Sequence, residues 1–553
     1  MRLSELMRGQ TYRRACGPED AEVSGLAHDS RRAEPGCAFF CLSGRSRDGH
    51  DFAAAAAARG AVAVVAERPV DLPPGVTCLL VPASRRALAL AAAAFRGWPS
   101  RRLRLYGVTG TNGKTTVNHL VEAVLRREGH VTGLLGTVEN RIAHRTTPAT
   151  LTTPDALEVQ SALAAMVSSG VTRACLEVSS HGLAGHRLGG CEFDVAVLTN
   201  VTRDHLDFHG DVRAYAATKL TLFEELGRPR TKAGPAYAVL NSDDQFFALF
   251  RDRIRVPVLT YGVTRASHVK LAGALLRPAG SLVRVTFDPR PRGQPEAGWL
   301  QPSAGWPEQA TLRFLHPGRH NVRNLMAALA VAWAEGCRWD RVLRAVETFP
   351  GVRGRWEVIR GPDGVTGVVD FAHNPGGLAQ ALETARLLAR RRVILVFGCE
   401  GEKDRGKRPL MGAVAARRAS HVILTTDNTF GEDRRRILAD VESGLAGPLP
   451  GGIGEARATY EVVEDRREAI FRAAAMAGSG DLVIVAGRGH DAKLVSGSRV
   501  ETLDDREVLA EALAAAHPGR ALAAAVAADP GPLGAPDYDY SHSMVAGGLE
   551  VTS

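Results

Sequence analysis

The chain has 553 residues, of which 45% are hydrophobic and 23% are charged. At about 150 residues per domain, this length predicts three or four domains, and the supply of aliphatic residues excludes a chain that is disordered throughout. The net charge is +9, and the 69 basic residues include seven Lys. They are scattered, without the block of about five or six like charges that marks a nucleic-acid stripe, so we expect no nucleic-acid partner.

The cysteines and the N-terminus indicate the compartment. The eight cysteines contain no CxxC pair, which is typical of free thiols in a reducing compartment. The N-terminal residues MRLSELMRGQTYRRACG lack the apolar stretch of a secretory signal. The Ala-rich runs at 53–58 and 87–94 are too short to cross a bilayer. We expect a cytoplasmic protein with no membrane contact.

The elements follow in chain order. Apolar runs at 62–66 and 78–81 alternate with helical stretches at 53–59 and 85–96, which predicts a small α/β unit over residues 1–98. A second unit, over 99–349, opens with a strand from Leu103, a Gly-rich turn and an amphipathic helix that ends at Gly129. Later elements of this unit are strands within 173–180, 194–200 and 236–241, an antiparallel stretch within 263–310 and an apolar helix at 321–336.

A third unit is predicted over 350–516. Four apolar strands each run into a polar or Gly-bearing turn, within segments 364–373, 391–399, 421–428 and 481–490. In open α/β sheets ligands gather at the carboxyl ends of the strands, where these turns fall. Residues 517–553 are rich in Pro, Gly and Ala, and we expect a flexible tail there.

The segment 107–116, GVTGTNGKTT, lies between a strand and a helix and predicts a phosphate loop. Its backbone N–H groups would converge on phosphates, Lys114 would reach the β/γ-phosphates, and the Thr115 hydroxyl would bind Mg²⁺. The strict GxxxxGK[ST] spacing would put a glycine at Val108, so the loop is a variant. It predicts a nucleotide ligand, ATP or GTP, and we find no NKxD segment of a GTPase. The expected ATP-binding residues here are Gly110, Thr111, Asn112, Gly113, Lys114, Thr115 and Thr116.

The variant loop and the segments around it resemble the Mur ligase family. The matching segments run in family order: 28–52, 107–116, 152–154, 177–183, 199–210, 214–223, 318–330, 351–357, 371–378, 397–411, 427–430 and 487–491. The branch that the chain resembles most adds the third amino acid to UDP-MurNAc-L-Ala-D-Glu in peptidoglycan precursor synthesis.

The resemblance implies an α/β fold of three domains: an N-terminal domain that holds the uridine nucleotide, a central P-loop ATPase, and a C-terminal Rossmann-like domain that holds the amino acid. It implies a monomer that uses ATP and Mg²⁺. ATP converts the carboxylate of a UDP-linked muramoyl peptide to an acyl phosphate, and the amino group of the acceptor displaces phosphate to form an amide. Two alternatives stay open: a ligase of specialised metabolism that uses a different carboxylate, and a catalytically silent scaffold.

The resemblance also implies roles for single residues. Lys114, Glu177, His205 and Lys219 match catalytic positions. Thr115, Glu177 and His205 match magnesium ligands. Lys219 matches a lysine that reacts with CO₂ to a carbamate, which is also a magnesium ligand. Asn324 and Arg355 match positions near the adenine and the phosphates, and 373–375 matches the HTP or HNP turn of the family.

The substrate residues match less completely. His28, Ser30, the loop 45–47, Thr152, Thr153, Ser179 and Arg187 match contacts to the uridine substrate, whereas Leu151 replaces a usual Asn. The acceptor residues are Lys403, Asp427, Asn428, Thr429, Phe430, Gly487 and Asp491. Here Lys403 replaces the Arg of a GGDRD segment, and Phe430 replaces the Arg of a DNPR segment. Because Lys403 has no bidentate fork and Phe430 has no charge, we expect an acceptor other than meso-diaminopimelate, one with a less polar side chain.

Overall fold

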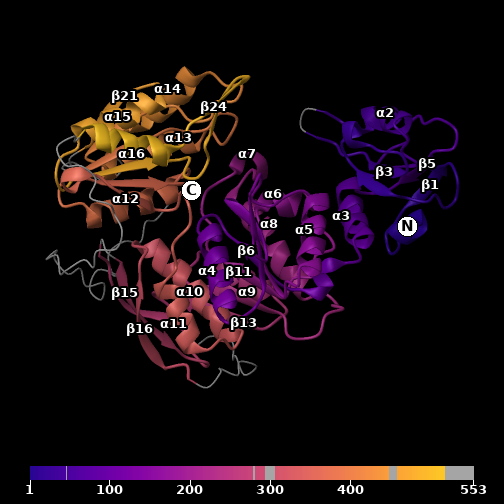
Figure 1. Cartoon of the computed structure of the whole chain (residues 1–553), viewed down its shortest axis with the longest axis horizontal. Coiled ribbons are helices and arrows are strands. Elements are labelled where there is room, and N and C mark those ends of the chain that lie inside the picture. The colour runs from indigo at the N-terminus through magenta and orange to yellow at the C-terminus, as the bar shows by residue number, and fades with distance from the viewer. Residues whose placement is uncertain (45–46, 278–279, 293–304, 448–456, 517–553) are drawn as a thin grey trace.

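The structure is a computed structural model that describes the chain except residues 45–46, 278–279, 293–304, 448–456 and 517–553. The chain forms three α/β units in sequence order, each built on its own sheet (Figure 1). The tail predicted at 517–553 lies outside the described residues. Within the described part of the chain, no helix is long and apolar enough to cross a membrane.

The N-terminal unit has a five-stranded sheet in the order β1-β5-β4-β3-β2, in which β1 is antiparallel to β5 and the other pairs are parallel. Its elements are α1 (Leu3–Leu6), β1 (Arg13–Cys16), β2 (Gly25–Ala27), η1 (Ser30–Arg32), β3 (Cys37–Phe40), η2 (Gly49–Phe52), α2 (Ala53–Ala58), β4 (Ala63–Ala66), β5 (Thr77–Leu80), α3 (Ser84–Phe95) and η3 (Pro99–Arg102). The strands expected at 62–66 and 78–81 and the helices beside them are confirmed.

The central unit has an eleven-stranded sheet in the order β16-β15-β14-β13-β12-β11-β6-β10-β7-β8-β9. Its strands are β6 (Arg104–Thr109), β7 (Thr132–Leu135), β8 (Glu139–Ile142), β9 (Arg145–Pro148), β10 (Arg173–Glu177), β11 (Val195–Leu198), β12 (Tyr237–Asn241), β13 (Val258–Gly262), β14 (Val269–Leu275), β15 (Ser281–Phe287) and β16 (Gln309–Phe314). Its helices are α4 (Lys114–Arg127), α5 (Ala156–Ser168), α6 (Ser180–Ala184), α7 (Leu206–His209), α8 (Val212–Leu226), α9 (Phe247–Arg253), α10 (Arg319–Ala334) and α11 (Trp339–Glu347). Strands β14, β15 and β16 pair antiparallel, which confirms the antiparallel stretch expected within 263–310.

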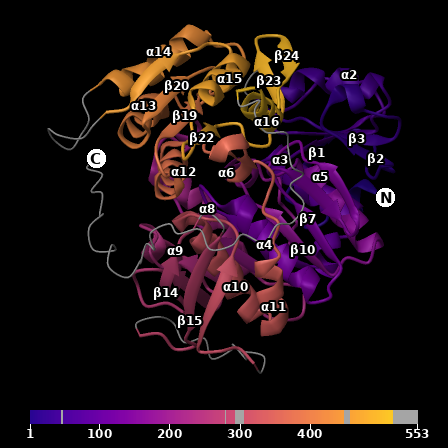
Figure 2. The same cartoon turned by 60° about the vertical axis from the view of Figure 1, so that its left-hand side comes forward.

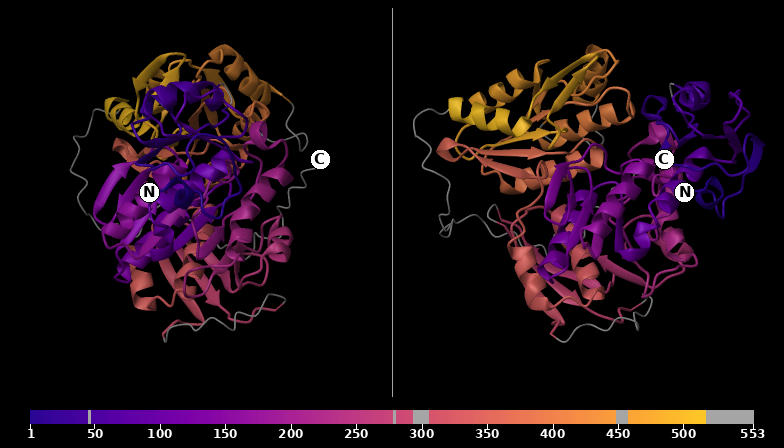
Figure 3. Two further views of the ribbon diagram at one scale, coloured as in Figure 1. Left: turned by 90° about the vertical axis from the view of Figure 1, so that its right-hand side faces the viewer. Right: turned by 45° about the vertical axis from the view of Figure 1, so that its right-hand side comes forward.

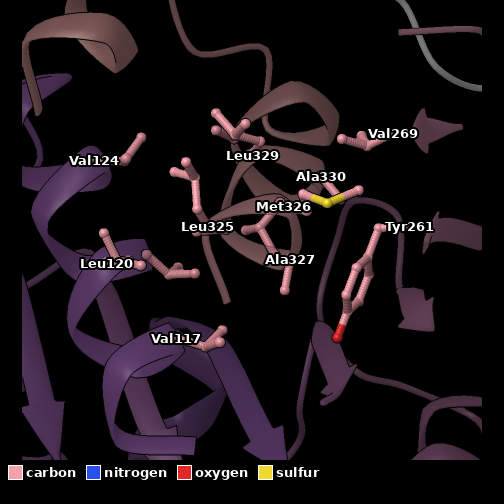
Figure 4. Close-up of a cluster of buried hydrophobic side chains, with 14 of the residues drawn as sticks. Val117, Leu120, Val124, Tyr261, Val269, Leu325, Met326, Ala327, Leu329 and Ala330 are labelled. Carbon is pink, nitrogen blue, oxygen red and sulfur yellow. The ribbon is translucent and has the colours of Figure 1, made fainter. Parts of the chain in front are cut away.

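Helices α4 and α10 pack together through buried aliphatic side chains at helical spacing (Figure 4). The side chains of Val117, Leu120 and Val124 on α4 face Leu325 and Leu329 on α10 (Figure 4). Burying each of these side chains contributes roughly 1.5 to 3 kcal/mol relative to exposure. This packing fixes the start of α4 at the carboxyl end of β6.

The C-terminal unit has a six-stranded sheet in the order β17-β18-β22-β19-β20-β21, parallel except for β17, and a separate hairpin of β23 and β24. Its strands are β17 (Glu357–Arg360), β18 (Thr366–Asp370), β19 (Val393–Phe397), β20 (His421–Leu424), β21 (Thr459–Val462), β22 (Leu482–Ala486), β23 (Lys493–Ser496) and β24 (Arg499–Thr502). Its helices are η4 (Pro362–Gly364), α12 (Pro375–Leu388), α13 (Lys407–Arg418), α14 (Arg434–Ala446), α15 (Arg466–Met476) and α16 (Asp505–Ala516). The four expected strands are confirmed.

The helices of the C-terminal unit cover both faces of its sheet. Helices α12, α13 and α14 pack on one face, and α15 and α16 pack on the other (Figure 2). The N-terminal and C-terminal units lie on the same side of the central unit (Figure 3). Residues at the carboxyl ends of β18 and β19, Asp370 and Glu400, line one pocket with residues 111–116 of the phosphate loop.

Candidate active site

A pocket of about 740 Å³ lies where the central and C-terminal units meet. The central unit contributes the phosphate loop, residues near 152, 177 and 204, and the start of α10. The C-terminal unit contributes residues between 370 and 381 and between 400 and 407. The predicted site residues on the pocket wall are Thr111, Asn112, Gly113, Lys114, Thr115, Thr116, Thr152, Thr153, Glu177, Ser179, Arg187, His205, Asn324, Arg355 and Lys403.

The phosphate loop joins β6 to α4, whose first residue is Lys114. Gly110 has a φ of 147° and Gly113 a φ of 87°, and a side chain at Gly113 would collide with the Asn324 amide. Glycine is therefore required where the loop turns and where α10 approaches it. The Lys114 ammonium donates to the carbonyl oxygens of Gly110 and Thr111, at 2.9 Å each. The unpaired N–H groups at the start of α4 make this loop suitable for phosphate.

Glu177 ends strand β10 with a carboxylate that is buried among hydrogen-bond donors. Its Oε2 accepts from the hydroxyls of Thr115 at 2.9 Å and Thr137 at 2.8 Å, and its Oε1 accepts from the Thr137 N–H at 2.8 Å. Arg355 donates to the Thr115 hydroxyl at 3.2 Å. Such oxygens are typical ligands of Mg²⁺.

The donor set around Glu177 also limits how a metal ion would be held. Within the described residues, no three His, Cys, Asp or Glu side chains are arranged to hold a metal ion. Mg²⁺ at nucleotide sites commonly takes one or two carboxylates and completes its shell with water and phosphate oxygens. The residues at Glu177 fit an ion that is held in that way.

Lys219 lies directly behind the phosphate loop, on α8, and is 1% exposed. Its ammonium donates to the Gly110 carbonyl oxygen at 2.9 Å, the same oxygen that Lys114 contacts, and lies 4.3 Å from the centre of the Tyr215 ring. Burial, and then the charge of Lys114, lower the pKa of Lys219 well below its usual value. Burial also lowers the pKa of Lys114. This environment favours the neutral amine of Lys219.

His205 lies at the junction of the central and C-terminal units. It has a φ of 55°, which few residues other than glycine adopt, directly before α7. Burial lowers the pKa of His205 to about 3, although the Asp204 carboxylate, 3.8 Å from its ring, opposes this shift. The His373 ring approaches the same carboxylate at 3.7 Å. His205 is therefore neutral at pH 7, the form that can bind a metal ion.

Two predicted ATP-binding residues approach the phosphate loop from outside it. Asn324 is buried on α10, where its Nδ2 donates to the Asn321 side chain at 3.3 Å beside Gly113. The Arg355 guanidinium lies 4.0 Å from the centre of the Phe371 ring, and burial lowers its pKa. The linker that carries Arg355 thus brings a cation of the C-terminal side to the start of α4.

The residues predicted to bind the uridine substrate form one cluster in the central unit. The Thr153 hydroxyl donates to the Glu177 carbonyl oxygen at 2.8 Å and accepts from the Ser179 N–H at 3.0 Å. Arg187 donates to the Thr153 carbonyl oxygen at 2.8 Å. Thr152 lies next to them on the pocket wall. The cluster contacts the backbone of Glu177 at the end of β10, so the predicted substrate residues adjoin a predicted metal ligand.

The N-terminal unit contributes the remaining substrate residues, which lie off the pocket wall. His28 approaches Asp155 at 3.4 Å and so connects the N-terminal and central units. Ser30 begins the short helix η1. Residues 45–46 of the predicted uridine loop lie outside the described residues. Leu151, the departure noted above, is 45% exposed on the pocket wall.

The predicted acceptor residues divide between the pocket wall and a hydrogen-bonded group away from it. Lys403 is on the wall. The Asn428 side-chain oxygen accepts from Arg488 at 3.1 Å and from the Val495 N–H at 2.8 Å, and its Nδ2 donates to Asp491 at 3.3 Å. The other members of this group are Asp427, Thr429, Phe430 and Gly487. Of the predicted acceptor residues, only Lys403 lines the pocket.

The loop that carries Lys403 is held from beneath by a buried ion pair. Arg408 has a fully buried side chain and donates to Glu432 at 2.7 Å and to the Glu400 carbonyl oxygen at 3.2 Å. Glu432 also accepts from the Glu402 N–H at 2.9 Å. The Lys403 ammonium lies 6.0 Å from the centre of the ring of Phe430, which replaces a cation here.

Thr137 and Glu400 are among the wall residues that sequence reasoning missed. Thr137 follows strand β7 and Gly136, and that strand, glycine and polar residue pattern could have indicated it. The Glu400 carboxylate makes no hydrogen bond to another described residue, and burial and then Asp427 raise its pKa. Glu400 follows strand β19 and Gly398, so the same pattern could have indicated it as well.

Comparison with known proteins matches three family models along the chain. They are described as "Mur ligase family, catalytic domain" over residues 22–104, "Mur ligase middle domain" over 108–332 and "Mur ligase, glutamate ligase domain" over 354–489. The chain is 41% identical over 487 residues to a UDP-N-acetylmuramoyl-L-alanyl-D-glutamate--2,6-diaminopimelate ligase of Geobacillus thermodenitrificans, which covers 88% of this chain and 94% of the relative. It is 38% identical to the ligase of that name from Listeria monocytogenes, over 92% of this chain and 97% of the relative.

Solved structures agree in fold. A structure of a UDP-N-acetylmuramoyl-L-alanyl-D-glutamate--2,6-diaminopimelate ligase superposes with a TM-score of 0.60 and 31% identity, and covers 90% of this chain and 95% of that one. MurF from Acinetobacter baumannii superposes with a TM-score of 0.59 at 20% identity, over 87% of this chain and 94% of that one, which shows likeness of fold alone.

Proposed function

The chain belongs to the Mur ligase family, and we propose that it is a ligase of the MurE type that uses ATP to join an amino acid to UDP-MurNAc-L-Ala-D-Glu in peptidoglycan precursor synthesis. The observation that carries the proposal is one pocket lined by the phosphate loop, by Thr152 and Thr153, and by Lys403. A reaction of three substrates requires this convergence, because ATP, carboxylate and amine must be held in contact.

In the first step, the substrate carboxylate attacks the γ-phosphoryl group of ATP, the bond from that group to ADP breaks, and an acyl phosphate and ADP result. Two anions meet in this step, so the site needs fixed positive charge more than a base. Lys114 and the N–H groups at the start of α4 would hold the phosphates. Arg355, buried beside the Thr115 hydroxyl, adds a second cation at the same end of the pocket.

Mg²⁺, when bound, would neutralise phosphate charge at this end of the pocket. The residues that would hold it are Thr115, Glu177 and His205, with a carbamylated Lys219 as a further ligand. The hydrogen bond between the Thr115 hydroxyl and the Glu177 carboxylate, 2.9 Å, supports this assignment, because it brings two of these oxygens together.

We propose that Lys219 reacts with CO₂: its neutral amine forms a bond to carbon and releases one proton, which gives an anionic carbamate. Two features support this proposal. The pKa of Lys219 is lowered by burial and by Lys114, which favours the reactive neutral amine. The Lys219 and Lys114 nitrogens both contact the Gly110 carbonyl oxygen, so an anionic carbamate on Lys219 would lie close to the Lys114 charge and be attracted to it.

In the second step, the amino group of the acceptor attacks the acyl phosphate, and the tetrahedral intermediate collapses to an amide and phosphate. Lys403, on the pocket wall, would attract the acceptor carboxylate as a single charge, without the two parallel hydrogen bonds of an arginine. Phe430, whose ring centre lies 6.0 Å from the Lys403 ammonium, adds no charge beside it. We propose an acceptor with a less polar side-chain end than the 2,6-diaminopimelate in the names of the relatives.

We further propose that the protein acts as a monomer in the cytoplasm, where nucleotide-linked precursors are made. The eight free cysteines, of which Cys16 is exposed, suit a reducing compartment.

The test is phosphate release by the purified full chain with ATP, Mg²⁺, UDP-MurNAc-L-Ala-D-Glu and a panel of amino acids. We expect release that requires both the UDP-linked carboxylate and one amino acid. Release that ignores the UDP-linked substrate but requires another carboxylate would favour a ligase of specialised metabolism, which the exposed Leu151 on the pocket wall makes the second candidate.

A further inference from the structure

Asn374, the N-cap residue directly before helix α12, joins the C-terminal unit to the phosphate loop through a pair of amide hydrogen bonds. The Asn112 Nδ2 donates to the Asn374 Oδ1 at 3.3 Å, and the Asn374 Nδ2 donates to the Asn112 Oδ1 at 3.0 Å. The Asn374 Nδ2 also donates to the Asp204 carboxylate at 3.0 Å, and its Oδ1 accepts from the Gly377 N–H at 2.8 Å. An asparagine amide offers two donors and two acceptor positions, so this one is fully used.

The setting of Asn374 makes this arrangement specific. Its side chain is 0% exposed, so water cannot replace a partner that is lost. Three of its four hydrogen bonds go to the central unit, and the fourth caps α12 within its own unit. A side chain that only capped the helix would need one acceptor oxygen and no donor. The two donors of Asn374 are therefore used for contact between the units.

Asn112 is held equally firmly on its own side. Its backbone N–H donates to the Asn200 side chain at 3.1 Å, and its carbonyl oxygen accepts from the Thr199 hydroxyl at 2.7 Å and from the Asn200 Nδ2 at 2.9 Å. The phosphate loop at Asn112 is thus braced by the central unit through its backbone and by the C-terminal unit through its side chain.

We propose that Asn374 is a positioning residue of the ligase reaction: through Asn112 it holds the C-terminal unit, and with it the acceptor amino acid, in register with the phosphate loop. This inference rests on the proposed function. The contact couples the two units reciprocally, because a loop in this conformation favours docking of the C-terminal unit and docking favours this loop conformation. A small misplacement of the amine relative to the acyl phosphate slows the second step.

The variant Asn374→Thr separates the two uses of the side chain, because threonine still caps a helix but loses both amide N–H donors and has only one hydroxyl on a shorter side chain. Asn112→Ser removes the partner amide from the other side. The matched control is Glu383→Gln, since Glu383 on the same helix α12 also contacts the central unit, 3.0 Å from Arg319 on α10, but both side chains of this pair are about one-third exposed. An ion pair that water can reach contributes little, so this control should behave as wild type.

Hydrogen exchange of the full chain tests the contact without any activity. In Asn374→Thr we expect faster amide exchange in residues 107–116, with exchange in 375–388 unchanged because the cap is kept. Unchanged exchange in 107–116 would overturn the proposal, because it would show that the phosphate loop does not depend on the amide donors of Asn374. This measurement tests the contact between the units without requiring activity. If the wild type forms no amide but the exchange changes as expected, only the proposed function fails.

Steady-state kinetics test the positioning role. Loss of these buried hydrogen bonds should lower kcat/KM for the acceptor by about tenfold in Asn374→Thr, and should raise the acceptor KM more than the ATP KM. The double variant Asn112→Ser/Asn374→Thr should be no worse than the poorer single variant, because both remove one contact. If the two losses multiply, or if Asn374→Thr keeps wild-type kcat/KM, the residues do not act through each other.

Discussion

The two ends of the pocket differ in how completely their charged side chains are paired with hydrogen-bond partners. At the phosphate end, the Glu177 carboxylate and the Lys114 ammonium each have hydrogen-bond partners, and the residues match the family motifs position by position. At the acceptor end, the Glu400 carboxylate makes no hydrogen bond to a described residue, and Lys403 and Phe430 depart from those motifs. Different units supply the two ends, so the activation of a carboxylate and the choice of an amine can change separately.

The largest expected effect is at the phosphate end. Lys114→Ala should lower kcat by about a thousandfold, because it removes a fixed cation from the site of phosphoryl transfer. The measurement is phosphate release under saturating substrates. Lys270→Ala, which removes a lysine on β14 away from the pocket, is the control and should keep wild-type activity. Near-normal turnover of Lys114→Ala would contradict the assignment of phosphoryl transfer to this end of the pocket.

Lys219→Ala should lower kcat by about a hundredfold, through loss of the anionic ligand that a carbamate would provide. Lys219→Arg should not restore activity, since a guanidinium forms no stable carbamate. The modification itself can be observed with ¹³C-labelled CO₂ by nuclear magnetic resonance: a carbamate signal in the wild type should vanish in Lys219→Arg. Full activity of the wild type in rigorously CO₂-free buffer would contradict the assignment.

At the acceptor end, Phe430→Arg should raise kcat/KM for meso-diaminopimelate by about thirtyfold, since a charged hydrogen bond to the second carboxylate contributes about 1.5 to 3 kcal/mol. Phe430→Leu is the neutral control and should leave the preference unchanged. The measurement is the ratio of kcat/KM values over a panel of amino acids. An equal gain in both variants would show that bulk, not charge, decides selection at this position.

The smallest effect concerns acid stability at the acceptor end. Hydrogen bonding to Arg408 lowers the pKa of Glu432 from its usual value to about 2. A carboxylate with a depressed pKa in the folded state stabilises the protein above its unfolded pKa, near 4.5, and this stabilisation is lost as the pH falls toward 2. Between about pH 6 and pH 3, the free energy of unfolding should therefore fall by about 1 to 2 kcal/mol more in the wild type than in Glu432→Gln.

Urea unfolding of both proteins at several pH values measures this difference. The free energy should be compared for the transition that reports the C-terminal unit, because a chain of three units need not unfold in one step. If the free energy of unfolding falls by the same amount in both proteins between pH 6 and pH 3, the Arg408 and Glu432 pair does not titrate as described.

Much of the fold could be predicted from the sequence, because its signals are local. The apolar strand, glycine loop and amphipathic helix around Lys114 are contiguous, and the four C-terminal strands each stand out as apolar runs before polar turns. The order of motifs along the chain was sufficient to indicate three α/β units. Strands β8 and β9 were not predicted, because they are short and lack a buried face: their residues are all half-buried or exposed.

The candidate site was predictable as a set of residues but not as a geometry. Matching motifs identified Asn428 and Lys403 as acceptor residues, yet only the structure separates the pocket wall from the group away from it. The pairing of Asn112 with Asn374 joins residues 262 positions apart, and no local pattern encodes such a contact. Sequence reasoning identifies which side chains are suited to a reaction, whereas their mutual distances follow from packing over the whole chain.

The amide contact between Asn112 and Asn374 has an electrostatic consequence. Helices α4 and α12 both begin at this contact, so the N-terminal ends of two helix dipoles come close to one another in the loop region. Each carries roughly half a positive charge that belongs to the backbone and therefore survives any side-chain substitution. A protein that lacks the Lys114 charge should consequently still bind nucleotide, weakly, and its affinity should fall as salt screens these partial charges.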